Sequence, residues 1–264
     1  MPRAKRRLGQ HFLTDRRILE RIADALEATA ADTVLEIGPG PGGLTEALAE
    51  RAGRLVAIEK DADLIPALRA RVPGARIVEG DALDADWHAL AGPEPLVAGN
   101  IPYNITSPLI DKALVPPRPR RIVFLVQKEV ADRVGAAPGT GAYGALSVGV
   151  QAVARAERLF TVPAGAFHPR PQVDSAVLRL TPLPEPTVSD AEVEPFRRLV
   201  VGLFGFRRKQ LGRGLRELTG WEAPRAEAAL GAAGIAPSSR PETVSPPGFA
   251  ALLRALVDGG WAGR

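Results

Sequence analysis

The sequence predicts an α/β fold: a mostly parallel sheet covered by helices, followed by a small all-helical domain. Short apolar runs alternate with helical stretches through the first half of the chain. Polar residues follow the ends of successive runs, at the edge where open α/β sheets bind ligands. A Pro-rich linker then precedes four segments of helical periodicity. We therefore expect one domain over residues 1–182 and a second over residues 189–264.

The first domain is built from alternating helices and strands. Residues 14–28 are predicted to form a helix, because Asp15 is placed to cap it and Ile18, Leu19, Ile22 and Leu26 form one apolar stripe. The expected strands are residues 33–37, 55–58, 76–78, 96–98 and 122–126, with helices at 44–51 and 64–72 between the first three.

Two strands and four helices are expected after these. Residues 147–153 and 175–180 are rich in Val, Ala and Ser and are predicted to form a terminal, hairpin-like pair of strands. The four predicted helices of the second domain are residues 193–206, 210–218, 223–233 and 247–257.

Composition excludes several kinds of site. The chain has 264 residues, 45% hydrophobic and 24% charged, which is typical of a globular protein, and no apolar run long enough to span a bilayer. It has no cysteine, so disulfides, thiolate metal sites and cysteine nucleophiles are excluded. Its three histidines are far apart without ligand spacing. We expect neither a metal nor a membrane.

Four polar residues mark a ligand crevice. Glu36, Glu59, Asp81 and Asn100 each lie at or near the carboxyl end of a successive predicted strand. In a parallel sheet these ends share one edge, where ligands bind. The sequence therefore predicts that the four side chains gather around one small molecule.

The glycine turn after the first strand leaves two cofactors open. Gly38, Gly40 and Gly43 satisfy the dinucleotide pattern G-x-G-x-x-G, and Glu59 follows at the distance of a ribose-binding acid, so a nicotinamide enzyme competes. S-adenosyl-L-methionine is favoured. Its methionine tail suits the turn beside Glu36, its ribose diol suits Glu59, and its adenine amine suits Asp81.

The stretch from Asn100 to Asn104 is suited to hold a nucleobase. The Asn100 side-chain oxygen and the Pro102 carbonyl are placed to accept hydrogen bonds from an exocyclic amine, and Tyr103 offers a face for stacking. We expect these three residues to be catalytic. A Pro-containing turn after a strand is the alternative reading of the same residues.

Basic residues are concentrated in two places. The net charge is only +4, yet one cluster crowds the first seventeen residues and another lies near residue 208. Two such patches indicate a polyanionic partner, most simply RNA, although solvated surface faces would have the same composition. The expected RNA contacts are Lys5, Arg6, Arg7, Arg207, Arg208 and Lys209.

Four motifs together make the chain resemble the ribosomal RNA adenine N6,N6-dimethyltransferases. They are residues 9–13 (GQHFL), 36–40 (EIGPG), 100–105 (NIPYNI) and 167–171 (FHPRP), and the resemblance extends from Lys5 to about Leu256. It implies a Rossmann-like class I methyltransferase sheet of seven mostly parallel strands, with S-adenosyl-L-methionine as cofactor.

The resemblance also assigns residues. It maps cofactor contacts onto His11, Leu13, Gly38, Glu59, Asp81 and Asn100, and it makes Phe167 the partner of Tyr103 in sandwiching an extruded base. Our reading of the crevice adds Glu36 and Gly40 to the cofactor site. His11 stands where many relatives carry Asn, and Ile101 replaces the commoner Leu.

Further motifs resemble the branch of the family that acts on the small ribosomal subunit. They are residues 126–130, 143–148, 173–177 and 206–209. That branch dimethylates N6 of two adjacent adenosines in a hairpin loop near the 3′ end of 16S rRNA during ribosome biogenesis. We therefore expect a cytoplasmic monomer whose partner is the 30S pre-ribosomal particle. The alternatives are a 23S rRNA methyltransferase of the Erm type, an NAD-dependent oxidoreductase, and a non-catalytic RNA-binding assembly factor.

Overall fold

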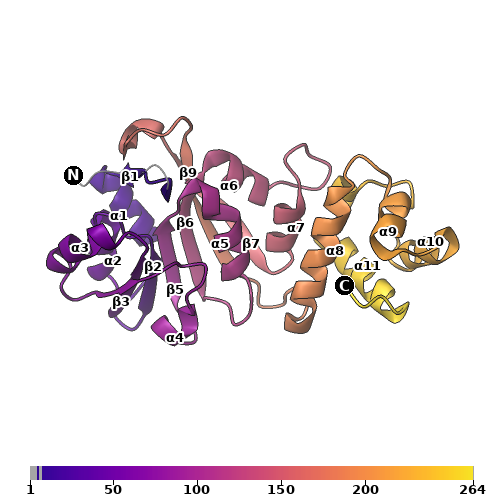
Figure 1. The fold of residues 1–264 in the computed structure, drawn as a ribbon, viewed down its shortest axis with the longest axis horizontal. Helices are drawn as coiled ribbons and strands as arrows, with labels where there is room; N and C mark the ends of the chain where they lie inside the picture. Colours follow the sequence, from indigo (N-terminus) through magenta and orange to yellow (C-terminus); the bar gives the residue numbers. More distant parts are fainter. Residues whose placement is uncertain (1–4, 6–7, 264) are drawn as a thin grey trace. The chain divides into compact units, whose positions relative to one another are not determined.

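The computed structural model describes Lys5 and residues 8–263 (Figure 1). The chain divides into two compact units: the first comprises residues up to 131 together with 156–182, and the second comprises 132–155 together with 183 to the end. Residues 132–155 thus group with the C-terminal helices. The domain boundaries expected from the sequence, 1–182 and 189–264, stay a prediction.

A seven-stranded sheet forms the centre of the first unit, in the order β4-β3-β2-β5-β6-β9-β7. Strands β4 to β6 run parallel along that order, and β9 is antiparallel to β6. The predicted fold class, a mostly parallel α/β sheet of seven strands with a helical C-terminal part, is confirmed. The strands are β2 (Thr33–Ile37), β3 (Arg54–Glu59), β4 (Arg76–Glu79), β5 (Leu96–Asn100), β6 (Arg121–Gln127), β7 (Ala154–Val162) and β9 (Ser175–Pro182).

The sheet is buried on both faces, because successive residues of its central strands are inaccessible to solvent. Val34 and Leu35 of β2, which point to opposite faces, are both fully buried. One face packs against α1, whose start is capped by the Asp15 carboxylate. The helices of this unit are α1 (Arg16–Ala25), α2 (Gly43–Ala49), α3 (Ile65–Arg71), α4 (Trp87–Ala91) and α5 (Thr106–Ala113); α6 (Lys128–Val134) spans the boundary between units.

A second, two-stranded sheet ties the N-terminal segment to the first unit. β1 (Phe12–Leu13) pairs antiparallel with β8 (Phe167–His168), which follows a short 3₁₀ turn at Ala164–Ala166. The Thr14 N–H and hydroxyl both donate to the Ala166 carbonyl, each at 3.0 Å. This pairing brings residues 8–13 to the edge of the sheet where β2, β3 and β5 end.

Helices make up the second unit, which packs around aromatic side chains. Tyr143 is fully buried, its hydroxyl donates to the Val244 carbonyl at 2.9 Å, and its ring packs edge-on to Phe204. No helix in the described part of the chain is long and apolar enough to cross a membrane. The helices here are α7 (Ala145–Gln151), α8 (Val193–Gly205), α9 (Leu211–Thr219), α10 (Ala223–Ala232) and α11 (Pro246–Asp258).

The prediction of a strand over residues 147–153 is wrong, because residues 147–151 belong to helix α7 and residues 152–153 form the turn that follows it. Ser147 explains the difference. Its Oγ accepts from the Gly144 N–H at 3.0 Å and donates to the Arg133 carbonyl at 2.5 Å, which fixes the first turn of a helix. Tertiary packing of this turn outweighs the β-propensity of the valines. The strand beside β9 on the side away from β6 is β7, whose charged residues obscure its strand pattern.

Candidate functional site

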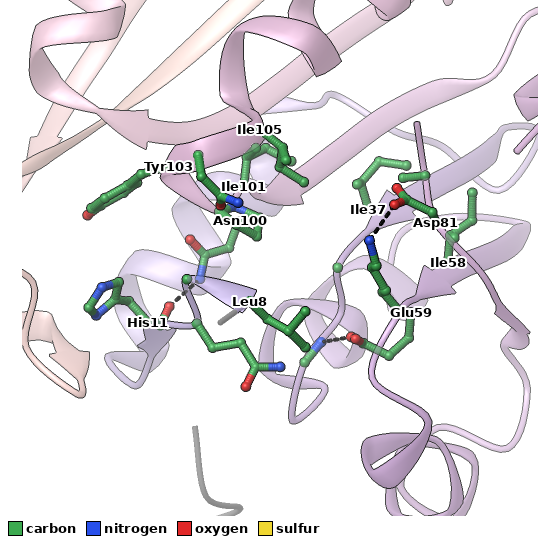
Figure 2. A pocket seen from close by; sticks show the side chains of 18 of the residues that line it. Leu8, His11, Ile37, Ile58, Glu59, Asp81, Asn100, Ile101, Tyr103 and Ile105 are labelled. Carbon is green, nitrogen blue, oxygen red and sulfur yellow. Dashed lines mark hydrogen bonds and ion pairs between the residues drawn. The ribbon is translucent and has the colours of Figure 1, made fainter. Parts of the chain in front are cut away.

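A pocket lies at the carboxyl ends of β2, β3, β4 and β5 (Figure 2). The N-terminal segment forms another of its walls. The pocket brings together eight of the residues expected to act at the site: His11, Gly38, Gly40, Glu59, Asp81, Asn100, Pro102 and Tyr103. Leu13 and Glu36 line an adjoining pocket that shares Gly38, Gly40 and Asn100 with the first.

Asn100 ends β5 and lines the pocket, and its side-chain oxygen accepts from no described residue. Its Nδ2 donates to the His11 carbonyl at 2.8 Å, and this bond sets which way the amide faces. Oδ1 is therefore left to accept a hydrogen bond from a ligand. Figure 2 shows Asn100 directed toward the segment that carries His11, with Tyr103 beside it.

Pro102 and Tyr103 begin the turn that follows β5. The Pro102 carbonyl accepts from the Ile105 N–H at 3.1 Å and from the Thr106 hydroxyl at 3.2 Å. A carbonyl oxygen has two lone pairs, so a further donor at this oxygen has to share or replace one of these bonds. The expectation that this carbonyl accepts from a target amine stays a prediction.

The Tyr103 ring is held at its edge and on one face. Its hydroxyl lies 2.9 Å from Ser175 Oγ, and its ring stacks on His11 with centroids 5.6 Å apart and planes 26° apart. Nδ1 of His11 donates to the Pro169 carbonyl at 2.7 Å, which leaves Nε2 as the acceptor in the neutral ring. Burial raises the pKa of Tyr103, so its phenol stays neutral.

Glu36 is the most buried acid near the crevice. It is 1% exposed, and its Oε2 has no hydrogen-bond partner among the described residues. Burial, reinforced by the charge of Glu59, raises the pKa of Glu36 to about 8. A positively charged ligand group in the adjoining pocket would favour the ionised form of this carboxyl and pair with it.

Glu59 shapes the glycine turn. One carboxylate oxygen accepts from the Gly40 N–H at 2.9 Å and the other from the Asp61 N–H at 2.7 Å. Gly40 has a φ of +56°, and a Cβ there would lie 3.2 Å from the Phe12 ring, so only glycine suits the position. Each Glu59 oxygen keeps a further lone pair for a ligand hydroxyl. Its predicted contact with a ribose therefore remains available.

Asp81 lies at the far end of the pocket and already has two partners. Its Oδ1 accepts from the Leu83 N–H at 2.9 Å, and its Oδ2 is 2.5 Å from Lys60 Nζ. The bond from Lys60 holds the pKa of Asp81 below its usual value. An adenine amine at Asp81 would share or replace the ammonium of Lys60, whose side chain is 60% exposed.

The N-terminal basic cluster is only partly described. Arg6 and Arg7, two of the expected RNA contacts, lie outside the described residues. The Lys5 ammonium lies 2.5 Å from carboxylate oxygens of both Asp61 and Asp63, and the Gln10 amide donates to Asp61 at 3.1 Å. In this structure Lys5 therefore fastens the N-terminal segment to the loop after β3.

The second basic cluster lies in the helical unit, after α8. Arg208 is exposed and forms no ion pair with any described residue. Its neighbours are engaged: Lys209 pairs with Glu217 at 2.7 Å, and Arg207 donates to the Gly141 carbonyl at 3.1 Å. RNA binding by all six basic residues stays a prediction.

Phe167 does not line the main pocket. It is 5% exposed, pairs with Leu13 across the small sheet, and packs into the apolar core beneath α1. Stacking of Phe167 on a base stays a prediction. Its packing shows that Phe167 contributes to the apolar core. The sequence reading missed Lys60, Gln10 and Ser175, whose contacts with Asp81, Asp61 and Tyr103 join distant segments. Among the described residues, no group of three or more acids and histidines is arranged to hold a metal ion.

Comparison with known proteins identifies what this arrangement is similar to. The family model described as ribosomal RNA adenine dimethylase matches residues 1–245. A protein of Geobacter metallireducens named ribosomal RNA small subunit methyltransferase A is 45% identical, over 97% of this chain and 96% of its own length. One of the same name from Phenylobacterium zucineum is 44% identical, over 96% of this chain and 88% of its own.

Two solved structures are similar over nearly the whole chain. The 23S rRNA methyltransferase ErmE has a TM-score of 0.70 and 32% identity, covering 93% of this chain and 99% of that one. A dimethyladenosine transferase from Plasmodium falciparum has a TM-score of 0.79 at 24% identity, covering 95% of this chain and 99% of that one, and shares the fold. Both units of the chain fall within these matches.

Proposed function

The chain belongs to the ribosomal RNA adenine dimethylase family, and from that premise we propose that it dimethylates N6 of two adjacent adenosines in small-subunit rRNA. It is a methyltransferase that uses S-adenosylmethionine. The observation that carries the proposal is the orientation of Asn100, which lines the pocket: its Nδ2 is committed to the His11 carbonyl, so Oδ1 is left as an acceptor for the N–H of an adenine.

The residues of the pocket fit the cofactor. Its ammonium group matches the orphaned oxygen of buried Glu36, which has no other partner among the described residues. Its ribose hydroxyls match the remaining lone pairs of Glu59, and its adenine amine matches Asp81. When bound, S-adenosylmethionine supplies an electrophilic methyl group on a sulfonium.

Asn100 and Tyr103 prepare the acceptor nitrogen. The lone pair of an adenine amine is delocalised into the ring, which makes it a poor nucleophile. A hydrogen bond from that amine to Asn100 Oδ1 favours a more tetrahedral nitrogen whose lone pair is directed out of the ring plane. Tyr103 stacks the extruded base, and the acceleration comes mainly from this positioning. Solvent removes the proton, which methylation acidifies.

Sequence similarity favours the small subunit as the substrate. The relatives named small subunit methyltransferase A are up to 45% identical to this chain, whereas the 23S enzyme is 32% identical. The nicotinamide alternative has no support among these relatives. We further propose that the protein acts as a monomer in the cytoplasm and that its partner is the 30S pre-ribosomal particle.

The test is methyl transfer from labelled S-adenosylmethionine to unmodified small-subunit particles, with 23S rRNA assayed in parallel. Digestion of the RNA to nucleosides identifies the product. We expect dimethyladenosine from the small-subunit sample alone. Label on 23S rRNA would assign the Erm-type activity, and bound cofactor without transfer to either RNA would indicate a non-catalytic assembly factor.

A further inference from the structure

Ser175 is a buried residue that contacts Tyr103, one of the residues of the candidate base site. It belongs to the motif at residues 173–177 and is the first residue of β9. Its side chain is fully buried, and its Oγ lies 2.9 Å from the hydroxyl of Tyr103, 72 residues away in the chain. This is the only side-chain hydrogen bond of Tyr103 to a described residue.

The anchor itself is rigid, because the start of β9 is fixed on two sides. Asp174, which precedes Ser175, accepts through its carboxylate from the Ala164 N–H at 2.9 Å and through its carbonyl from the Lys128 N–H at 3.0 Å. Ser175 also pairs with Gln127 of β6 across the sheet. The hydrogen bond between Tyr103 and Ser175 therefore ties the Tyr103 ring to the central sheet.

The ring needs such an anchor. Tyr103 lies in a short 3₁₀ turn and is half-buried, and its χ2 torsion has a broad energy minimum. His11 covers one face of the ring. With its hydroxyl tied to Ser175 and His11 against one face, the ring is held in one orientation, and its other face is left for a base in the pocket that Tyr103 and Asn100 both line.

We propose that Ser175 is a positioning residue for the methyl-transfer reaction: by holding the Tyr103 hydroxyl it fixes the plane on which the target adenine stacks. The inference rests on the proposed function. It assigns Ser175 no contact with substrate or cofactor, so its effect passes through Tyr103 alone.

The second methylation depends more on the position of the Tyr103 ring than the first, which a loss of fold stability alone would not explain. The first methylation replaces one N–H of the amine, so the monomethylated base has one hydrogen bond fewer to hold it. Stacking on Tyr103 then carries a larger share of its positioning. Loosening the ring is therefore expected to slow the second methylation more than the first, and monomethyladenosine accumulates.

The experiment compares Ser175→Ala, Tyr103→Phe and the double variant on small-subunit particles, with Ser147→Ala as the matched control. Ser147 is also a fully buried serine with two hydrogen bonds, but it lies in the helical unit. We expect kcat to fall about tenfold in each of the first two variants. The ratio of monomethyladenosine to dimethyladenosine rises in both, cofactor affinity stays unchanged, and the double variant is no worse than either single one.

The outcomes separate the inference from the proposed function. If the wild-type protein transfers no methyl group to small-subunit particles, the proposed function fails. If the wild type is active and Ser175→Ala keeps its kcat and product ratio, the inference fails. Additive losses in the double variant, or the same rise of monomethyladenosine in Ser147→Ala, would also overturn it, because they would show an effect that does not pass through Tyr103.

Discussion

Glu36 links the charge state of the site to the stability of the fold. In the unfolded chain a glutamate loses its proton near pH 4.5, whereas burial raises the pKa of folded Glu36 to about 8. Between these values the folded protein holds a proton that the unfolded chain has released. Stability is therefore present in full below pH 4.5 and is lost as the pH rises toward 8.

We expect Glu36→Gln to remove this dependence. The share of Glu36 in the free energy of unfolding should fall by up to about 1.4 kcal/mol per pH unit across that window, and the variant should lose that share while keeping the smaller one of Glu59, whose pKa burial also raises. Urea unfolding at pH 5, 6, 7 and 8 measures it. Glu79→Gln, at an exposed glutamate, is the control that should keep the wild-type slope. Equal slopes in wild type and Glu36→Gln would show that Glu36 is ionised in the folded protein.

The role proposed for Asn100 depends on the orientation of a single amide. Asn100→Ala removes both the acceptor for the target amine and the bond to the His11 carbonyl. We expect methyl transfer to fall about a hundredfold or more, while the lost hydrogen bond costs the fold only about 1 kcal/mol. Single-turnover transfer together with thermal unfolding separates the two effects. Turnover near that of the wild type would exclude Asn100 from the reaction.

At the scale of elements, the N-terminal segment is a wall of the candidate pocket. Residues 8–12 line it, and their position depends on β1 pairing with β8 and on the contacts of Lys5 and Gln10 with Asp61. Because Asp61 is buried and holds both partners, it is the residue on which the fastening depends. Its pKa is lowered because it accepts hydrogen bonds from Lys5 and Gln10, which outweigh its burial.

Asp61→Asn should therefore weaken cofactor binding, although Asp61 does not line the pocket itself. We expect the Kd for S-adenosylmethionine, measured by calorimetry, to rise about tenfold as the segment loosens. Asp24→Asn is the control for the loss of a paired carboxylate elsewhere, since the exposed Asp24 of α1 pairs with Arg51 at 2.8 Å, away from the pocket lining. An unchanged Kd for Asp61→Asn would mean that the small sheet alone holds the segment in place.

The sequence reading of the elements succeeded where one local signal dominated. The central strands are apolar runs with polar residues at their carboxyl ends. Glu36, Glu59 and Asn100 lie at or next to those ends in the structure and line the two adjoining pockets. It failed at residues 147–153, where the hydroxyl of Ser147 and tertiary packing overrode the preference of valine for strands. The contacts of Ser175 with Tyr103 and of Lys60 with Asp81 join segments with no shared periodicity, so no local pattern contains them.

At the scale of the molecule, basic charge is distributed over both compact units. Lys5 belongs to the unit with the pocket, and Arg207, Arg208 and Lys209 belong to the helical unit. Their ion pairs differ: Lys5 and Lys209 are committed to carboxylates, whereas Arg208 is exposed and has none among the described residues. The number of basic residues therefore exceeds the number of cations that can bind phosphate without first leaving a carboxylate.

This difference predicts how RNA affinity depends on salt. Each phosphate contact releases counterions, so its loss flattens the plot of log K against log salt by about 0.7 to 0.9. We expect Arg208→Gln to lower both the affinity and the slope by one such contact, and Lys209→Gln to change them less, because Glu217 already holds that ammonium. Binding of small-subunit rRNA, measured at about 50 to 300 mM salt, gives both the affinity and the slope. Arg198→Gln, which removes an exposed arginine paired with Glu194, controls for the change in net charge and should keep the wild-type slope. A slope that Arg208→Gln leaves unchanged would remove Arg208 from the RNA-binding surface, because its free guanidinium would then meet no phosphate in the complex.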